Sequence, residues 1–454
     1  GHLWDFLKKE CSEDDIVLDT QLIDPDKDYS EKKRENIYVT LKGKGDGGFI
    51  ATSYTDIVPP GDPSKWPGKN PYSVKEGIAK RTGECKIEIE TEGETYKRQI
   101  RDKMDRIWEK RNISETKILM GRGVYDNKAS IVNLVGSILG LNHALKEKDK
   151  KLKGDLIHGH LVDEETKNIG IKNMVGWGDS KDWLGENYSS YKDFTAVVLE
   201  GSYGFVPVVG FRGLMWVTLR SKGEASHAST PELGRNAVLG MSKALSYTDT
   251  DEFESKIKEP FKKDELLGEL TIASGTTIVG GDINKVDHET GKVDRGSYNA
   301  IPDWCETTFD IRFPRWKGYP EGMDKLRKRI EKVIENSASE QTDDVEFEAT
   351  ALKSDFFPPV ALVENRDTAM ENPLVNTAAT SAKDIFGYDT GIEIAPGITD
   401  AALLYHGTHI PTLVEYGPAG ALSHEPLEYV EKEQVIEGAK AMLNIAVREL
   451  GITD

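Results

Sequence analysis

Short apolar runs of strand character alternate with helical stretches before residue 210, and this alternation constrains the fold more than any other feature of the chain. Residues 48–53 and 155–162 read as buried strands, and residues 129–145 have the apolar spacing of an amphipathic helix. Strands and helices that alternate in this way build a sheet covered by helices. The sequence therefore predicts an α/β domain with a helix-covered mixed sheet.

A different pattern begins near residue 210. Residues 214–219, 307–313 and 345–351 alternate between apolar and polar positions, as half-buried strands do. Residues 231–247 and 323–334 read as helices. Strands and helices in this order fit an inserted α+β domain of ferredoxin-like type.

The α/β pattern returns after residue 372, where we expect helices at residues 374–386 and 431–450. We therefore expect a catalytic domain in two parts, residues 1–209 and 356–454, because 454 residues are about three times the usual length of one domain. Residues 210–355 would form the domain inserted between these two parts.

A stretch rich in Lys, Glu and Gly lies within the first part of the predicted catalytic domain, at about residues 68–116. It is longer than a connecting loop should be, and residues 85–95 read as a small hairpin. We interpret the stretch as an insertion near the entrance of the site, where it would narrow the choice of substrate.

The charge balance disfavours several classes of partner. The chain has 59 Lys and Arg against 78 Asp and Glu, and the net charge of −19 is spread along the sequence. This disfavours nucleic acid and anionic membranes as partners. No apolar run is long enough to span a bilayer.

The cysteines and the start of the chain bear on its location. Cys11, Cys85 and Cys305 are odd in number and far apart, so we expect neither a disulfide framework nor a thiolate metal cage. The first ten residues carry charges where a secretory signal would need an apolar stretch, and Gly1 in place of Met reads as a truncated start. We expect a cytoplasmic protein in which any metal is held by His, Asp and Glu.

Acidic residues and one histidine stand beside the predicted elements. The acids Asp163, Glu164 and Glu165 directly follow the strand at 155–162, at the edge where α/β folds gather their sites. Asp126 precedes the helix at 129, and His424 follows a Gly-rich loop. Taken singly, these residues fit better as an acidic turn, a helix N-cap and a structural or exposed histidine. Together they offer the oxygen and imidazole ligands that a divalent cation prefers.

Five ordered motifs resemble those of the co-catalytic zinc amidohydrolases and peptidases, a family that includes acetylornithine deacetylase, succinyl-diaminopimelate desuccinylase, aminoacylase, carnosinase-type dipeptidases and glutamate carboxypeptidase. The motifs are residues 54–62, 121–128, 163–165, 200–201 and 424–428. The likeness runs from about residue 45 to the end of the chain.

The resemblance implies a metal site with Asp126 as the ligand that bridges two zinc ions. Glu165 and His424 would complete one site, and Glu200 would join the other. Two neighbouring cations need a bridging carboxylate, and they lower the pKa of a shared water. The implied cofactor is Zn²⁺, one or two per chain, with Co²⁺ or Mn²⁺ as alternatives.

The resemblance also implies catalytic roles for residues that bind no metal. Glu164 would be the general base that takes a proton from the attacking water, and Asp56 would orient a metal ligand. In the inserted lid, His227 would reach the active site of a partner subunit and steady the tetrahedral oxyanion. A helix-capping role for His227 remains open, and the lid would make the protein a homodimer.

Substrate-binding residues are implied in the same way. Asn299 and Arg312 would bind the carboxylate of the substrate, and Thr399 lies in a loop, residues 396–400, that resembles the desuccinylase and deacetylase branch. An ordinary ion pair at the edge of a strand remains open for Arg312. The loop at residues 59–66 resembles the same branch.

One position departs from the family. Tyr54 stands where the family's first motif has a histidine ligand, and a neutral phenol with a pKa near 10 is a poor ligand for zinc. Three outcomes are open: one metal held by Asp126, Glu165 and His424, a Tyr54 phenolate ligand, or weakened or lost hydrolysis. His158 and His160 could supply an imidazole, although a buried structural role fits both better.

These inferences predict a metal-dependent hydrolase that cleaves an amide bond next to a free carboxylate, by attack of metal-activated water with a glutamate base. Its substrate would be a small N-acyl amino acid or a short peptide, which makes it a deacylase or desuccinylase, or else a peptidase. A carnosinase-like dipeptidase or carboxypeptidase is the first alternative. A silent binding protein of the same family is the second, because Tyr54 replaces a ligand.

Overall fold

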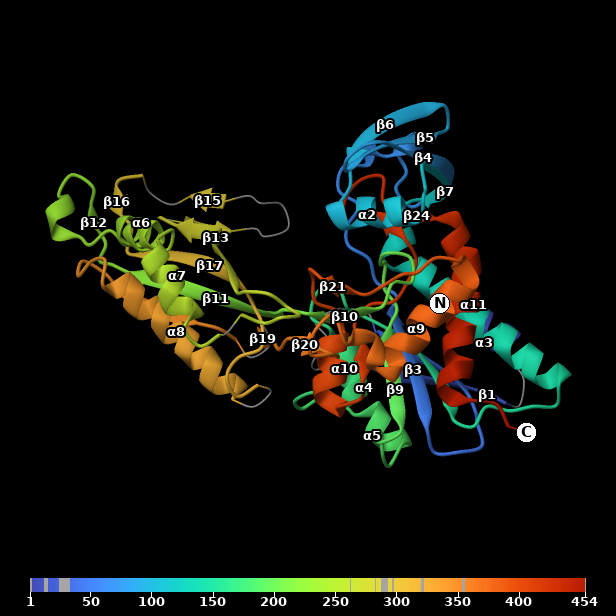
Figure 1. The fold of residues 1–454 in the computed structure, drawn as a ribbon. Helices are drawn as coiled ribbons and strands as arrows, with labels where there is room; N and C mark the ends of the chain where they lie inside the picture. The colour runs from blue at the N-terminus through green and yellow to red at the C-terminus, as the bar shows by residue number, and fades with distance from the viewer. Residues whose placement is uncertain are drawn as a thin grey trace. The chain divides into compact units, whose positions relative to one another are not determined.

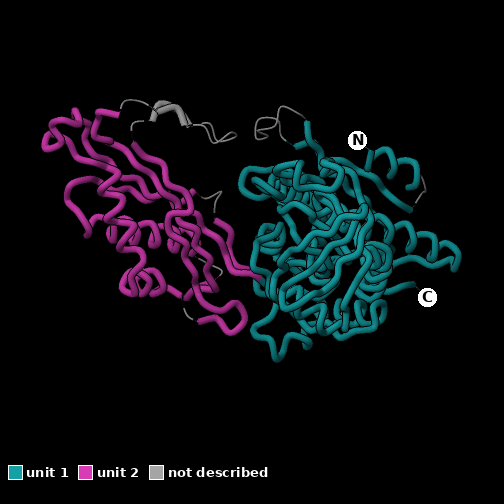
Figure 2. Tube along the Cα trace, turned by 90° about the horizontal axis from the view of Figure 1, so that it is seen from above, with its two compact units in different colours: residues 1–210, 360–454 teal, residues 211–359 magenta. Residues whose placement is uncertain are grey.

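The computed structural model describes residues 2–11, 15–23, 33–261, 263–281, 283–286, 293–295, 298–319, 322–352 and 356–453. The chain forms two compact units, which Figure 2 shows in different colours. Unit 1 comprises residues 1–210 and 360–454, and unit 2 comprises residues 211–359.

A six-stranded mixed sheet forms the centre of unit 1 (Figure 1). Its strands, in spatial order, are β1 (Ile16–Leu22), β2 (Glu35–Leu41), β8 (Asp155–Leu161), β3 (Gly48–Tyr54), β9 (Phe194–Val198) and β22 (Thr412–Leu413). β3 is parallel to β8 and β9, and β22 is parallel to β9. Every residue of β3 and β8 is buried, as expected of parallel strands covered on both faces.

Helices pack on both sides of this sheet. α3 (Ala129–Glu147) and α11 (Lys432–Leu450) pack against each other and against β3, and α9 (Pro373–Phe386) packs against α11. α4 (Ile169–Val175), α5 (Trp183–Asn187) and α10 (Ala401–Thr408) lie on the other side of β3 and β9 (Figure 1). The predicted strands and helices of the α/β part are thus confirmed to within a few residues, because burial on both faces leaves a clear apolar signature.

The remaining small elements of unit 1 complete its edges. They are α1 (His2–Glu10) and a three-stranded sheet of β20 (Val360–Ala361), β10 (Val208–Phe211) and β21 (Glu393–Ala395).

The stretch interpreted as an insertion belongs to a second six-stranded sheet of unit 1. The strands, in spatial order, are β23 (Gly420–Ala421), β24 (Tyr429–Glu431), β7 (Glu115–Met120), β4 (Lys75–Gly83), β5 (Lys86–Thr91) and β6 (Glu94–Gln99). β5 and β6 form the predicted hairpin, whose turn contains Gly93 at φ 82°, a left-handed conformation that glycine adopts freely. α2 (Asp102–Lys110) follows the hairpin.

Buried polar contacts join this segment to the rest of unit 1. Arg111 forms a two-pronged ion pair with Glu431 at 2.9 and 2.7 Å, and the indole of Trp108 donates to the same carboxylate at 2.8 Å. Both charged side chains of the pair are almost fully buried. Removing the segment would leave the Glu431 carboxylate buried without its partners, which is strongly destabilising. The segment is therefore an integral part of unit 1.

Unit 2 is an antiparallel sheet with helices on one face. Its main strands are β13 (Thr271–Gly280), β17 (Trp304–Phe313), β11 (Gly213–Lys222) and β18 (Glu346–Thr350), with β19 (Phe356–Phe357) also paired to β11. β14 (Ile283–Val286) pairs with β15 (Val293–Arg295), and β12 (Ser226–His227) with β16 (Ala300–Ile301). Buried and part-exposed residues alternate strictly along β17. This explains why the sequence alternates between apolar and polar residues here and why the strand could be predicted.

The helices of unit 2 are α6 (Ala237–Tyr247), α7 (Asp251–Lys258) and α8 (Met323–Ser339). The prediction of one helix over residues 231–247 was wrong at its start. Residues 231–233 form a separate short turn, and Asn236 caps α6 by accepting a hydrogen bond from the Leu239 N–H at 3.1 Å. The asparagine side chain therefore decides where the helix begins.

No helix in the described part of the chain has the length and the apolar composition that crossing a membrane requires.

Candidate metal centre

The topology of the central sheet brings acidic residues together at one edge. Parallel strands end at the same edge of a sheet, where α/β proteins gather their sites. Asp56 follows β3, residues 163–165 follow β8, Glu200 follows β9 and Glu415 follows β22. Four strand ends thus each contribute at least one carboxylate.

Asp126, Glu165 and His424 form a compact group of potential metal ligands. One ligand atom from each residue lies within 4.8 Å of the others. The His424 Nε2 atom is 3.2 Å from an Asp126 oxygen and 3.0 Å from a Glu165 oxygen. Asp126 comes from the turn before α3, and His424 comes from the loop between β23 and β24. The structure therefore brings together the three residues that the sequence suggested for one metal.

The donor set fits a divalent cation. The Glu165 side chain is 8% exposed, and its Oε1 atom is buried with no hydrogen-bond partner. Hydrogen bonds to Asp126 and Glu165 raise the pKa of His424 to about 10, so a proton now balances these carboxylates. A bound cation would replace this proton, because a metal-binding histidine is neutral. Two carboxylates and one imidazole suit zinc, which takes three protein ligands and a water in catalytic sites.

Further carboxylates crowd around this group. Burial, followed by the negative charges of Glu200 and Asp400, raises the pKa of Glu164 well above its usual range. Burial, followed by the charges of Glu415 and Asp126, does the same to Glu200. Acids that repel each other in a buried site favour the binding of a cation.

Asp400 and Glu415 are parts of the site that sequence reasoning did not assign. Burial raises the pKa of Asp400 to about 7 and that of Glu415 to about 8. Glu415 follows the short run Thr412–Leu413, as Asp56 follows β3. An acid directly after a short apolar run was therefore the signal that could have identified Glu415.

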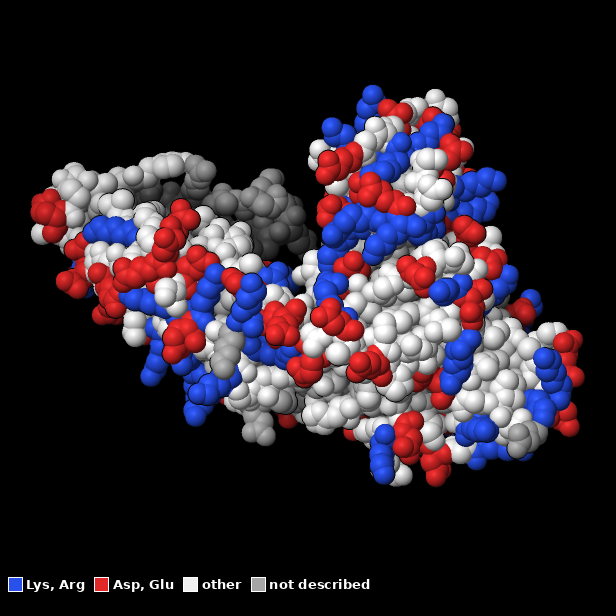
Figure 3. All heavy atoms as spheres, in the orientation of Figure 1, with Lys and Arg blue, Asp and Glu red and all other residues white. Residues whose placement is uncertain are grey.

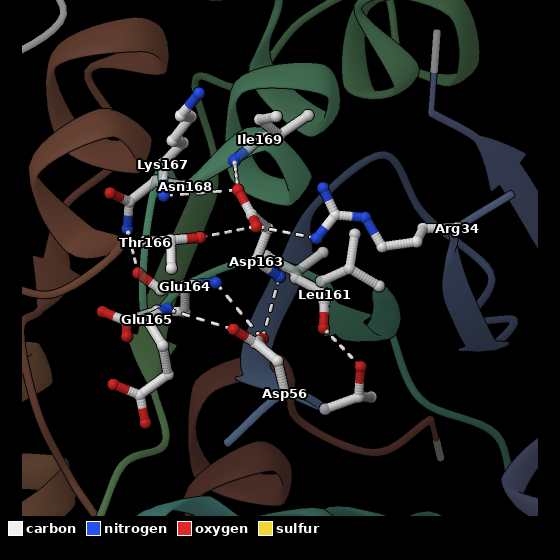
Figure 4. Close-up of polar contacts among 12 residues, drawn as sticks. Arg34, Asp56, Leu161, Asp163, Glu164, Glu165, Thr166, Lys167, Asn168 and Ile169 are labelled. Atoms are coloured by element: carbon white, nitrogen blue, oxygen red, sulfur yellow. Dashed lines mark hydrogen bonds and ion pairs between the residues drawn. The ribbon is translucent and has the colours of Figure 1, made fainter. Parts of the chain in front are cut away.

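Asp56 supports the loop that carries Glu164 and Glu165. Its carboxylate accepts hydrogen bonds from the backbone N–H groups of Asp163, Glu164 and Glu165 at 2.8, 3.2 and 3.1 Å (Figure 4). The resemblance implied that Asp56 orients a metal ligand. In this structure its contact with the ligand loop runs through the backbone.

Asp163 holds the same loop from the opposite side. It accepts hydrogen bonds from Arg34 at 2.7 Å and from the Thr166 hydroxyl at 2.6 Å, and its side chain is 1% exposed (Figure 4). The loop is thus tied to β3 by one aspartate and to Arg34 by another. Sequence reasoning missed Arg34, which lies 129 residues away from its partner.

Glu428 shapes the turn that contains Asp126. Its carboxylate accepts from the backbone N–H groups of Gly123, Tyr125 and Asp126 at 3.1, 3.0 and 3.0 Å. It also pairs with Arg122, and both side chains are buried. Glu428 therefore positions a ligand through the backbone, as Asp56 does.

Tyr54 ends β3 inside the site. It is 1% exposed, and its hydroxyl donates a hydrogen bond to the Asp126 Oδ1 atom. Burial, followed by the charges of Glu200 and Asp126, raises the pKa of Tyr54 well above its usual range. The tyrosine is therefore a hydrogen-bond donor in this structure.

His158 and His160 lie on β8 and are fully buried. Burial, with a smaller contribution from His160, lowers the pKa of His158 to about 3, and burial lowers that of His160 to about 4. Neither belongs to the group of potential metal ligands among the described residues. Both stay neutral, as expected of structural histidines.

Two predicted residues of unit 2 lie side by side. His227 is on β12, and its Nε2 atom is 3.4 Å from the Asn299 amide nitrogen. The other ring nitrogen of His227 is 2.7 Å from the Ser229 hydroxyl. Both His227 and Asn299 are exposed, and their roles stay predictions.

Arg312 and Thr399 are engaged within their own units. Arg312 binds Asp310 through two contacts of 2.7 and 2.9 Å, which is the ion pair left open by the sequence. The Thr399 hydroxyl donates to the Val414 carbonyl at 2.8 Å and accepts from the Ala401 N–H at 3.2 Å. A contact of either residue with substrate stays a prediction.

Two cations at the start of α2 and directly before it, Lys103 and Arg101, border the acidic edge. The Lys103 ammonium group donates to the Ile394 carbonyl and lies 5.7 Å from the centre of the Tyr203 ring. Lys103 and Arg101 both lower the pKa of Glu415 against the effect of burial. Figure 3 shows Lys and Arg side chains gathered over this part of an otherwise acidic chain.

Comparison with known proteins shows what the chain is similar to. The sequence model of Peptidase family M20/M25/M40 matches residues 104–448. An uncharacterized metallohydrolase of Methanocaldococcus jannaschii is 24% identical over 421 residues, which cover 91% of this chain and 84% of that protein. A succinyl-diaminopimelate desuccinylase of Rickettsia bellii is 20% identical over 444 residues, covering 97% and 91%.

A solved structure shares the fold. A tripeptidase from Staphylococcus aureus matches with a TM-score of 0.59 and 20% identity, and the match covers 98% of this chain and 91% of that one.

Proposed function

The chain belongs to Peptidase family M20/M25/M40 and is therefore a metal-dependent hydrolase, and from this premise we propose that it cleaves an amide bond next to a free carboxylate. The observation that carries the proposal is the group of Asp126, Glu165 and His424 within 4.8 Å, with Glu164 directly beside it in the chain. The substrate is a small N-acyl amino acid or a short peptide. We place the enzyme in the cytoplasm. Its three cysteines are far apart and suggest no disulfide framework, which is typical of proteins of a reducing compartment.

Asp126, Glu165 and His424 would hold the metal, for which zinc is the proposed ion and Co²⁺ or Mn²⁺ are alternatives. The ion supplies Lewis acidity and lowers the pKa of a nearby water. Glu164 takes the proton from this water as it attacks the amide carbonyl, and then delivers the proton to the leaving amine. Burial and the neighbouring carboxylates raise the pKa of Glu164, and a bound cation would act in the opposite direction by favouring its charged form.

Asp56 and Glu428 hold the reacting groups in position. The Asp56 carboxylate accepts hydrogen bonds from the backbone of the Glu164 loop, and the buried Glu428 carboxylate accepts one from the backbone of the Asp126 turn. Partners of this outer kind commonly contribute about 10–100-fold to metal affinity or activity. The remaining predicted role in unit 1 is a substrate contact at Thr399, which the loop resemblance supports.

We also propose that two copies of the chain share each active site. His227 and Asn299 lie beside the start of β17, and Arg312 lies at its end. A strand of this length spans about 30 Å, because each residue adds about 3.3 Å. One small substrate therefore cannot contact all three residues of a single copy, whereas a homodimer can supply His227 and Asn299 from one copy and Arg312 from the other.

Mixing two inactive variants tests this arrangement. We expect Glu164→Gln and His227→Ala to be inactive alone and to regain activity when mixed and allowed to exchange subunits. In the mixed dimer, one site combines an intact Glu164 with an intact His227 from the other copy. Purified Glu164→Gln mixed with Asn299→Ala should recover in the same way. His227→Ala mixed with Asn299→Ala should not recover, because each site takes both residues from the lid of one copy and would still lack one of them. Absence of recovery in a verified mixed dimer would contradict the shared site.

The proposed activity is tested with a panel of substrates and a chelator. We expect hydrolysis of N-acyl amino acids or dipeptides that is lost with a chelator and restored by zinc. Capping the carboxylate of the substrate as an amide should lower kcat/KM by about 10–100-fold, because a hydrogen bond to a charged group contributes about 1.5–3 kcal/mol. If the protein is freed of metal, reloaded with zinc and still hydrolyses no substrate of the panel, the result would support the alternative of a binding protein without hydrolase activity. A strict need for a free amino terminus would favour the dipeptidase.

The segment at residues 68–116 is better tested by point changes than by deletion. The proposal that it narrows substrate choice rests on Arg101, directly before α2, and Lys103 within α2, which both lower the pKa of Glu415. Deletion would also remove Arg111 and Trp108, which hold the buried Glu431. Point substitutions at Arg101, which is exposed, leave the contacts of Arg111 and Trp108 with Glu431 intact.

A further inference from the structure

The two oxygens of the Asp126 carboxylate have different neighbours. Oδ2 lies 3.2 Å from His424, on the side of the three-ligand group. Oδ1 accepts a hydrogen bond from the Tyr54 hydroxyl. A carboxylate that bridges two metal ions needs one oxygen for each ion. The oxygen that would bind a second ion is therefore already engaged.

Tyr54 is held firmly in this place. It is the last residue of β3 and pairs with Leu161 of the parallel strand β8. The residue is 1% exposed, so its hydroxyl lies in the interior of unit 1 and not in solvent. The hydrogen of its phenol hydroxyl is directed at the Asp126 carboxylate, so Tyr54 acts as a hydrogen-bond donor at this oxygen.

The other donors at this position are too few for an ion. Glu200 offers one carboxylate, whose Oε2 atom is buried without a hydrogen-bond partner. Among the His, Cys, Asp and Glu residues that the structure describes, only Asp126, Glu165 and His424 form a group of three ligand atoms within 4.8 Å, and this group does not contain Glu200. Zinc takes at least three protein ligands in its catalytic sites. The residues around Glu200 therefore do not fit a second ion.

We propose that the Tyr54 hydroxyl takes the place of a second metal ion, so that each chain holds a single ion at Asp126, Glu165 and His424. The hydroxyl donates its proton to the Asp126 Oδ1 atom and leaves Oδ2 for the ion. Tyr54 is thus a positioning residue that acts through Asp126. This inference rests on the proposed function, because it assumes that the group of three binds metal.

The test is the metal stoichiometry of three full-length proteins: wild type, Tyr54→His and Tyr54→Phe. Each is freed of metal, equilibrated with excess zinc, separated from unbound zinc and measured by elemental analysis. We expect about one zinc for the wild type and about two for Tyr54→His, because the imidazole adds a nitrogen ligand beside Glu200 and frees Oδ1. We expect about one for Tyr54→Phe, with weaker binding because Asp126 loses its donor.

Tyr38→Phe is the matched control. Tyr38 is also a fully buried tyrosine of the central sheet, and its hydroxyl donates to the Gln21 side chain at 2.9 Å instead of to a carboxylate of the ligand group. It should bind the same amount of zinc, with the same affinity, as the wild type. Titration with Co²⁺, followed by visible absorption, gives an independent count in folded protein.

The outcomes separate this inference from the proposed function. Two ions of similar affinity in the wild type would overturn the role of Tyr54 and leave the hydrolase proposal standing. One ion in both the wild type and Tyr54→His would also overturn it, because the tyrosine would then not be what closes the second position. No ion in the wild type would overturn the proposed function as well.

Discussion

Replacing Glu164 by Gln is expected to lower kcat by about 10²–10⁴-fold, the usual contribution of a general base, while the metal content stays that of the wild type. The amide cannot accept the proton of the attacking water, although it has nearly the same shape as the carboxylate. The backbone of residue 164 keeps its hydrogen bond to Asp56, so the loop stays in place. KM should change little, because the change removes a step of the reaction and no binding group.

Steady-state kinetics with elemental analysis of the same sample checks this expectation. Glu186→Gln is the matched control, because it makes the same change at an exposed position in α5 and should leave kcat unaltered. A Glu164→Gln variant that keeps more than a tenth of the wild-type kcat would assign the base to another residue. Loss of metal together with activity would make Glu164 a ligand instead.

Replacing His424 by Ala is expected to weaken metal binding by about 100-fold or more. Loss of a residue that only supports a ligand costs about 10–100-fold, and His424 is a direct ligand in the proposed site. His424 supplies the nitrogen of the group, and without it Asp126 and Glu165 face each other with no positive charge between them. Without the imidazole, Glu165 loses the partner that lowers its pKa against burial and the charge of Asp126, so a proton competes more strongly with the metal for this carboxylate. Activity at low metal concentration should fall in parallel.

The measurement is the dissociation constant for zinc, obtained by competition with a chelating dye. His143→Ala is the control, because His143 is exposed on α3 and contacts Glu147 at 3.3 Å, outside the group of potential ligands. Recovery of His424→Ala activity at high zinc would support a loss of affinity. Unchanged affinity would show that the ion binds elsewhere.

Local patterns explain which parts of the fold were predictable. β3, β8 and α3 are buried on a whole face or more, so their period or their continuous apolar run is visible in the residues themselves. The start of α6 was missed because a single hydrogen bond from the Asn236 side chain decides it. Such a contact leaves no periodic trace.

The candidate site divides in the same way. Asp126, Glu165 and His424 were found because each stands in a recognisable motif at the end of an element. Arg34 and Glu415 were missed because their roles depend on contacts with residues that are distant in the sequence. Arg34 lies 129 residues from Asp163, and only the strand order of the sheet brings Glu415 near Glu200.

The integration of the segment at residues 68–116 was also beyond the sequence. Its length suggested an addition to the catalytic domain, but β7 pairs with β24 and Arg111 reaches Glu431. These are pairings between residues more than three hundred positions apart. Composition and length alone cannot show them.

The hairpin formed by β23 and β24 has a consequence for how the site comes into being. Its loop carries both His424, which faces the ion, and Glu428, which shapes the turn of Asp126. The two flanking strands are paired with each other, and β24 is paired with β7. A newly made chain therefore has neither its nitrogen ligand nor the carboxylate that shapes the turn of Asp126 until its C-terminal part has been synthesised. Before that point, the imidazole that lies between Asp126 and Glu165 is missing from the site.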